Sequence, residues 1–113
     1  MLGLFFVQAA ASALELVRAV HPTPAVGGDP TEVALALIDE LEEADRGAYA
    51  GPVGWVDAAG NGDWVVGIRS AEVDGATARL FAGVGVVADS DPDLELAETR
   101  AKFQAMLSAL VRP

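Results

Sequence analysis

The sequence predicts an α+β domain, an antiparallel three-stranded meander flanked by helices. Two helical segments, at about residues 5–20 and 29–43, precede three extended runs, and a third helical segment follows them from Asp91. The turn dipeptides Asn61-Gly62 and Asp74-Gly75 separate the extended runs, and Asp-Gly is among the strongest hairpin signals in a sequence. Strands joined by such short turns pair antiparallel, so these observations favour a meander over a parallel sheet.

Length and composition limit the organisation of the chain. Its 113 residues have room for one domain or part of one, and 52% hydrophobic with 21% charged residues predicts a globular fold with a buried core. The 17 acidic and 7 basic residues leave a formal charge of -10, which repels phosphate backbones and anionic lipids. We therefore expect no nucleic-acid and no membrane partner. The absence of cysteine excludes disulfides and thiolate sites and is compatible with a cytoplasmic location.

The first helical segment places an apolar stripe along residues 5–20, formed by Leu14, Val17 and Leu4 or Phe6. Its beginning, MLGLFFVQAAASA, shares an apolar stretch and small residues with secretory signals, but no Lys or Arg precedes that stretch. The apolar run is also far shorter than the ~20 residues that a membrane span requires. A helix at the start of the domain is the simpler prediction.

The second helical segment follows HPTPAVGGDPTEV, a Pro- and Gly-rich stretch with the only histidine, His21, which we expect to order a loop. Asp29 can cap the helix, Pro30 fits its first position, and Glu32 completes a capping box. The helix is predicted to end near residue 43, with Gly47 free to adopt a left-handed conformation. One face is predicted to be buried, and it comprises Val33, Leu37, Ile38 and Leu41, whereas Glu42 and the other acidic residues stay in solvent.

The three extended runs are YAGPVGWVDA, WVVGIRSAEV and TARLFAGVGVV. Pro52 indicates that the first run is an edge strand or begins late. Trp55 and Trp64 have apolar neighbours and are predicted to lie in the core. The last helix begins at Asp91, a plausible N-cap, with Pro92 in its first turn.

Two of these runs carry residues that are unusual in a strand. Alternation places Arg69 on the same side as Val65 and Ala71, and a guanidinium among such neighbours needs an anionic partner if it is buried. The alternative is an arginine that reaches solvent from an edge strand. Gly83 and Gly85 share one face of the third run and leave backbone exposed, to a ligand or to a packed helix.

Three charged residues share one face of the last helix, because Glu95, Glu98 and Lys102 are three and four residues apart. Glu98 and Lys102 alone make an ordinary helical ion pair, worth about 0.2–0.5 kcal/mol. Two carboxylates one turn apart can also hold Mg2+, which binds a few carboxylates together with water and substrate oxygens. Both interpretations stay open at this point.

Four segments, HPTPAVGG, DRGAYAGPVGWVD, IRSA and LFAGVGVVADSDPDLELAETRAK, together resemble successive C-terminal motifs of the chorismate-binding enzymes, in the isochorismate synthase branch. Anthranilate and aminodeoxychorismate synthases carry a different loop in place of HPTPAVGG. The resemblance implies that residues 12–113 are the C-terminal part of a chorismate-binding domain, within a larger layered α/β sandwich. Residues 1–11 do not share it and form an atypical N-terminal segment.

The resemblance also implies a ligand, chorismate, and a cofactor, Mg2+, which bridges a carboxylate of this dianion to glutamates in the family. Glu98 would be a metal ligand, and Glu95 its near neighbour, acting directly or through water. Lys102 would compensate the charge of the glutamates and help to place the substrate.

On the substrate side, the resemblance implies that Tyr49 and Arg69 hold a carboxylate of chorismate beside the backbone amide of Gly83. Ala25 occupies the position where relatives that also expel pyruvate tend to carry threonine. Alanine there favours isochorismate as the product.

The proton-transfer groups of the family, a lysine that activates water and a glutamate that protonates the departing hydroxyl, lie upstream of these motifs, as does a further metal-binding glutamate. Before His21 the chain holds only Glu15 and Arg18 as charged residues, and neither matches those groups. General acid–base catalysis contributes ~100- to 10000-fold, so we expect a truncated, catalytically incomplete portion of an isochorismate synthase.

Three alternatives stay open: a module that binds chorismate or another dicarboxylate without converting it, half of a split enzyme, and a purely structural domain. A three-stranded piece of a layered sandwich would expose a sheet edge and a sheet face, so we also expect self-association or a missing N-terminal half as partner. Neither menaquinone nor siderophore biosynthesis is favoured by these residues.

Overall fold

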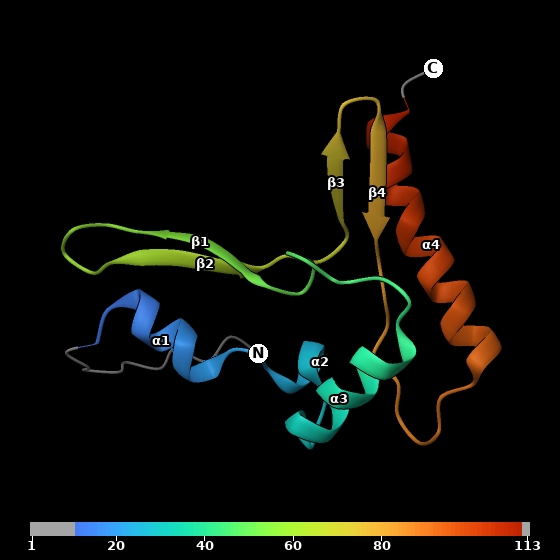
Figure 1. Ribbon diagram of the computed structural model, residues 1–113, viewed down its shortest axis with the longest axis horizontal. Helices are drawn as coiled ribbons and strands as arrows, with labels where there is room; N and C mark the ends of the chain where they lie inside the picture. The colour runs from blue at the N-terminus through green and yellow to red at the C-terminus, as the bar shows by residue number, and fades with distance from the viewer. Residues whose placement is uncertain (1–10, 112–113) are drawn as a thin grey trace, which may run out of the picture.

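The computed structural model of the chain describes residues 11–111, which form helices and short strands (Figure 1). In chain order the elements are α1 (Ala13–Val20), α2 (Pro24–Gly27), α3 (Thr31–Leu41), β1 (Pro52–Val56), β2 (Gly62–Val66), β3 (Ser70–Asp74), β4 (Thr77–Phe81) and α4 (Pro92–Leu110). This mixed composition confirms the α+β class. Within residues 11–111, no helix has both the length and the apolar character needed to cross a membrane.

The strands pair as two separate antiparallel hairpins, β1–β2 and β3–β4, so the predicted three-stranded meander is wrong. The second extended run breaks at residues 67–69. Arg69 has a φ of 48°, in the left-handed region, which no strand continues. Gly67 instead accepts a hydrogen bond from the Ala50 N–H (2.7 Å) and donates to the Gly51 carbonyl (2.8 Å). The chain therefore leaves one hairpin and starts the next in a new direction (Figure 1).

The two hairpin turns differ in how well they were predicted. Asp74-Gly75 is confirmed, since Asp74 ends β3 and Gly75 has a φ of 56° in the two-residue connection. The first turn is not built on Asn61-Gly62, because Gly62 already belongs to β2. Asp57 organises it instead, accepting hydrogen bonds from the backbone N–H groups of Ala59 and Asn61, both at 2.9 Å. The hydrogen bond from the Asn61 side chain, together with these backbone bonds, holds the pKa of Asp57 below its ordinary value.

The helix α1 begins at Ala13 and packs against the β1–β2 hairpin (Figure 1). Ser12 and Glu15 form a capping box, in which the Ser12 hydroxyl accepts from the Glu15 N–H and the Glu15 carboxylate accepts from the Ser12 N–H. The predicted helix start at residue 5, with Leu4 and Phe6, lies outside the described residues.

The segment between α1 and α3 departs from its prediction in two ways. A single helical turn, α2, forms within the stretch expected to be a loop, with Pro24 at its first position. The capping box of Asp29 is absent, because α3 begins one residue later than predicted, with Pro30 as its N-cap. Asp29 thus precedes the cap, and the Thr31 hydroxyl donates to the Gly28 carbonyl instead, at 3.2 Å. The helix ends at Leu41, two residues early.

The helix α4 follows its prediction closely and lies beside β4 (Figure 1). One carboxylate oxygen of Asp91 accepts hydrogen bonds from the N–H groups of Asp93 (2.9 Å) and Leu94 (3.1 Å). Asp91 is therefore the N-cap, and Pro92 opens the first turn.

The predicted hydrophobic core is wrong for residues 11–111, of which only Gly27 is buried. Val33, Leu37 and Leu41, expected on the buried face of α3, are 66%, 51% and 68% exposed. Trp55 is 55% exposed, and Trp64 is only partly buried. The physical reason is that two-stranded hairpins and single helices leave one face of each element without an opposing layer. Apolar faces of this kind are normally covered by further protein.

Candidate functional site

An open cavity of about 490 Å³ lies among α2, the segment before β1, the β2–β3 connection, the segment after β4, and α4. Its lining includes all five residues that the sequence predicts to bind substrate: Ala25, Tyr49, Arg69, Gly83 and Lys102. Each of them comes from a different one of these five parts of the chain. Residues that are separated by up to 77 positions in sequence thus converge on one cavity.

The charge of this cavity is opposite to that of the chain. Arg46, Arg69 and Lys102 line it, whereas Glu42 is the one carboxylate among the described lining residues. Three of the 7 Lys and Arg residues gather here in a chain of formal charge -10; Arg46 pairs with Glu42 and Lys102 with Glu98, so Arg69 is the lining cation without an ion-pair partner among residues 11–111. Such a site favours an anionic ligand.

The ring of Tyr49 is held within this cavity by two side chains. It stacks on Phe81 with the ring centroids 5.5 Å apart and the planes 16° from parallel. The Arg46 guanidinium lies 5.6 Å from the centroid of the Tyr49 ring, a distance typical of a cation–π contact. The backbone N–H of Tyr49 also donates to the Arg46 carbonyl, at 2.9 Å.

Gly83 lies next to the Tyr49 hydroxyl, beyond the end of β4. The prediction that Gly83 and Gly85 share a strand face is wrong, because the pairing ends where Phe81 meets Ser70, the first residue of β3. A Cβ atom built at Gly83 would lie 2.8 Å from the Tyr49 hydroxyl oxygen, whereas one at Gly85 would meet nothing within 4 Å. A side chain at position 83 would therefore force the Tyr49 hydroxyl to move, and glycine permits this close approach of backbone and phenol.

Arg69 lies in the connection between β2 and β3 and is exposed. The prediction that strand alternation places Arg69 on the same side as Val65 and Ala71 is therefore wrong. Among residues 11–111, the non-glycine residues with positive φ are Arg69 (48°) and Ala50 (63°), and both line the cavity. This conformation costs an L-residue about 1–3 kcal/mol and is enriched at functional sites. Neither ion pair of the described residues includes Arg69.

On α4, Lys102 connects the cavity to the glutamates. Its ammonium group lies 2.7 Å from a carboxylate oxygen of Glu98 and donates to the Gly83 carbonyl at 3.0 Å. Neither Glu98 nor Glu95 is itself a lining residue, although Glu98 pairs with one. Glu98 has a half-exposed side chain, and Glu95 is partly buried one turn earlier.

The described residues contain no cluster of three or more His, Asp or Glu side chains that could hold a metal ion on their own. Glu98 and Glu95 supply hard oxygen ligands from one helix face. Mg2+ is commonly bound by one or two carboxylates, with waters and substrate oxygens completing its coordination. The carboxylates of Glu95 and Glu98 therefore fit Mg2+ when waters and substrate oxygens complete its coordination.

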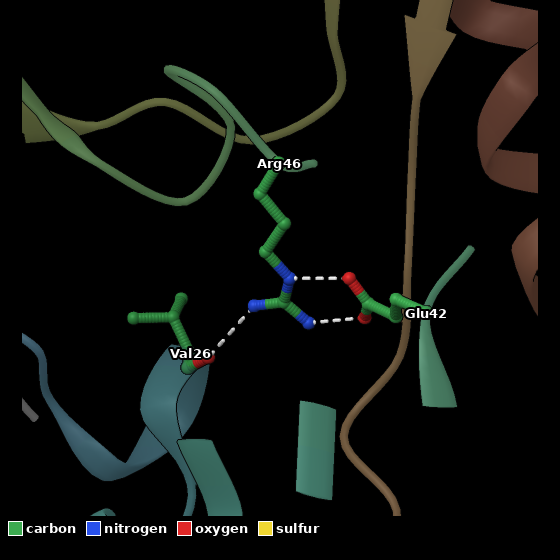
Figure 2. A network of polar contacts seen from close by, with 3 residues as sticks. All are labelled: Val26, Glu42 and Arg46. Atoms are coloured by element: carbon green, nitrogen blue, oxygen red, sulfur yellow. Dashed lines mark hydrogen bonds and ion pairs between the residues drawn. The ribbon is translucent and has the colours of Figure 1, made fainter. Parts of the chain in front are cut away.

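Sequence reasoning missed the role of Arg46 and its pairing with Glu42, which is exposed as predicted. Arg46 forms a two-pronged ion pair with Glu42, with its Nε 2.7 Å from one carboxylate oxygen, and donates from Nη1 to the Val26 carbonyl at 3.4 Å (Figure 2). The hydrogen bond with Arg46 lowers the pKa of Glu42, and the same bond raises the pKa of Arg46. The spacing of four residues between them is the signal that could have identified the pair.

Comparison with known proteins identifies relatives of this chain. The family described as "Chorismate binding enzyme" matches residues 6–111. Isochorismate synthase MenF of Bacillus subtilis is 49% identical over 92% of this chain and 22% of its own length, and isochorismate synthase DhbC of the same species is 54% identical over 88% and 25%.

A solved structure from Bacillus anthracis, described as that of a 2,3-dihydroxybenzoate-specific isochorismate synthase, DhbC, superposes with a TM-score of 0.85 at 56% identity. The matched region comprises 88% of this chain and 26% of the chain in that structure. The chain thus spans about a quarter of the length of the relatives it matches. Because the family match extends over nearly the whole sequence, the chain belongs to the chorismate-binding enzyme family.

Proposed function

We propose that this chain supplies the carboxylate-binding side of a chorismate site of the isochorismate synthase type. The observation that carries the proposal is the convergence of Ala25, Tyr49, Arg69, Gly83 and Lys102 on one cationic cavity. Chorismate is a dianion, and an excess of positive charge in an acidic chain suits it.

Arg69 and Tyr49 are the groups we assign to one substrate carboxylate. The Arg69 guanidinium has no ion-pair partner among residues 11–111, so its paired donors are available for bidentate binding. The Tyr49 hydroxyl lies beside the backbone of Gly83, whose N–H has no backbone acceptor within that part of the chain. A hydroxyl and a backbone amide so close together can donate to the same carboxylate.

Glu98, with Glu95 acting directly or through water, would hold Mg2+, which when bound neutralises a substrate carboxylate and fixes its place. The Lys102 ammonium, between Glu98 and the Gly83 carbonyl, balances the charge of the glutamate at the edge of the cavity. Ala25 leaves its side of the cavity without a hydroxyl, and we propose isochorismate rather than a pyruvate-elimination product for the complete enzyme.

We further propose that the chain is a catalytically incomplete portion of such an enzyme. Converting chorismate to isochorismate requires a base to activate water and an acid to protonate the departing hydroxyl. Within the cavity lining, Glu42 pairs with Arg46 and Lys102 pairs with Glu98, and we assign neither to proton transfer. Catalysis would then depend on groups from other polypeptide.

The second candidate is a binding module or half of a split enzyme. The exposed apolar faces favour it, because Val33, Leu41 and Trp55 lie on surfaces that a complementary chain could cover. In either case this chain would bind the ligand, and only the partner would supply proton transfer.

The test is a calorimetric titration of chorismate into the chain, with and without Mg2+. We expect saturable, Mg2+-dependent binding that weakens about 10- to 150-fold on Arg69→Ala, since a charge-assisted bond contributes about 1.5–3 kcal/mol. Arg100→Ala is the matched control, because Arg100 is exposed on α4 outside the cavity lining. Equal affinity of the Arg69→Ala and wild-type chains, or no binding by the wild type, would contradict the proposal.

A further inference from the structure

We propose that Arg46 is a positioning residue for Tyr49, an inference that rests on the proposed function of the cavity. Arg46 lines the substrate cavity and also two smaller ones, of about 340 and 190 Å³, on its other sides. Arg46 thus borders three cavities, and its guanidinium lies 5.6 Å from the centroid of the Tyr49 ring.

The side chain of Arg46 is itself fixed by two separate segments (Figure 2). Its Nε and Nη2 donate to the two carboxylate oxygens of Glu42, directly after α3, and its Nη1 donates to the Val26 carbonyl of α2. Its side chain is 26% exposed, so the guanidinium is largely shielded from water. A planar fork with a further N–H donor is the group that can satisfy both partners at once.

Because the Arg46 guanidinium is held in place by these bonds, it can hold the phenol ring of Tyr49 in place. The Tyr49 ring has two such neighbours, the Arg46 guanidinium 5.6 Å from its centroid and Phe81, on which it stacks. Tyr49 is partly buried in a turn, and among the described residues its backbone N–H donates to the Arg46 carbonyl. Removing the guanidinium removes the cation–π contact and keeps the stacking on Phe81, so the ring is held less firmly and the hydroxyl can move away from Gly83.

A lysine at position 46 would not replace Arg46. An ammonium group is a compact point charge and cannot donate in parallel to both oxygens of Glu42 while also reaching the Val26 carbonyl. It would keep the charge near Tyr49 without its fixed position. The Arg46→Lys variant therefore shows whether the fixed position of the guanidinium matters for Tyr49, or only its positive charge.

The first experiment needs no ligand, because Tyr49 is the only tyrosine of the chain. With ring-labelled tyrosine, nuclear Overhauser effects report directly whether the ring stays near Phe81 and Gly83. We expect these effects in the wild type and in the Arg100→Ala control, and loss of the effects between Tyr49 and Gly83 in Arg46→Ala and Arg46→Lys, while those to Phe81 can remain. Persistence of the effects between Tyr49 and Gly83 in Arg46→Ala would overturn the inference.

A milder variant, Glu42→Gln, keeps the test decisive if Arg46→Ala loses helical structure. Glu42→Gln preserves the shape of the partner and removes its charge, so Arg46 is held less firmly. We expect the effects between Tyr49 and Gly83 to weaken while the helical circular dichroism is unchanged. Full retention of these effects in Glu42→Gln together with retention in Arg46→Lys would refute positioning by Arg46.

The second experiment asks whether Arg46 acts through Tyr49, by measuring chorismate affinity with Mg2+ for Arg46→Ala, Tyr49→Phe and the double variant. We expect about tenfold weaker binding for Arg46→Ala alone and less than twofold further weakening when it is added to Tyr49→Phe. A purely structural role would weaken binding by the same factor in both backgrounds, and that result overturns the inference. Absence of chorismate binding by the wild type refutes the proposed function, whereas the tyrosine signals still decide the role of Arg46.

Discussion

Gly83→Ala is the substitution for which the structure gives the most specific expectation. The added Cβ would lie 2.8 Å from the Tyr49 hydroxyl oxygen. Carbon and oxygen atoms in contact lie about 3.3–3.6 Å apart, so the hydroxyl must move by roughly 0.5–0.8 Å. The ring cannot simply tilt, because Phe81 and Arg46 contact it.

The magnitude follows from how that clash is relieved. Overpacking by one methyl group costs about 1–3 kcal/mol when the neighbours must hold their places. If Tyr49 moves away instead, the free chain avoids most of this cost but the hydroxyl is no longer beside the backbone of residue 83. The cost then falls on ligand binding, and the dissociation constant for chorismate should rise about 5- to 150-fold.

Gly85→Ala is the matched control for this prediction. Gly85 belongs to the same segment and lines the same cavity, and its added Cβ would have nothing within 4 Å. Neither glycine has a positive φ, so both backbones accept an alanine. Calorimetric titrations of chorismate with Mg2+ should show weaker binding for Gly83→Ala and wild-type affinity for Gly85→Ala. Equal affinities for the two variants would refute the steric reasoning.

Three further predictions concern charge and helix capping. The Arg46 hydrogen bond lowers the pKa of Glu42 below its ordinary 4.5, so this contact stabilises the fold above that pH and is lost as the pH falls through the lowered value. Thermal unfolding from pH 7 to 3 should therefore show a smaller loss of stability for Glu42→Gln than for the wild type, and parallel pH profiles would count against the contact. Glu98→Gln should abolish the Mg2+ dependence of chorismate affinity and Glu95→Gln should reduce it less; an unchanged Mg2+ dependence in Glu98→Gln would exclude it as a ligand. Asp91→Ala removes two hydrogen bonds from the first turn of α4 and should destabilise it by about 0.5–2 kcal/mol, seen as faster amide exchange there, whereas unchanged protection would show that the cap contributes nothing.

Features that depend on a few neighbouring residues could be predicted from the sequence. The Asp91 cap, the Asp74-Gly75 connection and the left-handed Gly47, with a φ of 54°, are all local, and all are confirmed. The break after β2 could not be predicted in the same way. WVVGIRSAEV reads as one extended run, and its interruption goes with the hydrogen bonds between Gly67 and residues 50 and 51, an interaction between distant segments.

The buried face of α3 shows a different limit. A helical pattern of apolar residues identifies which face can be buried, as for Val33 and Leu37, but it does not supply the layer that buries it. The pattern correctly identified α3 as amphipathic, but the prediction that its apolar face is buried was wrong. Where no opposing layer is present, composition and periodicity overestimate the core.

The candidate site was predictable through resemblance and not through periodicity. No local pattern relates Tyr49, in a turn, to Lys102, near the middle of α4, yet both line the same cavity. Arg46 shows the converse, because its spacing from Glu42 was visible but its contact with Tyr49 depends on how the turn folds. Its contribution therefore became apparent only from the structure.

The most direct test of the central claim is to incubate the chain with chorismate and Mg2+ near neutral pH, separate the products by chromatography, and titrate binding on the same sample. We expect saturable binding and no isochorismate above a control without protein. Isochorismate formation would contradict the claim, because residues of this chain would then supply both the base and the acid. Absence of binding would contradict it from the other side, because the cavity around Tyr49 and Arg69 would then not hold the ligand.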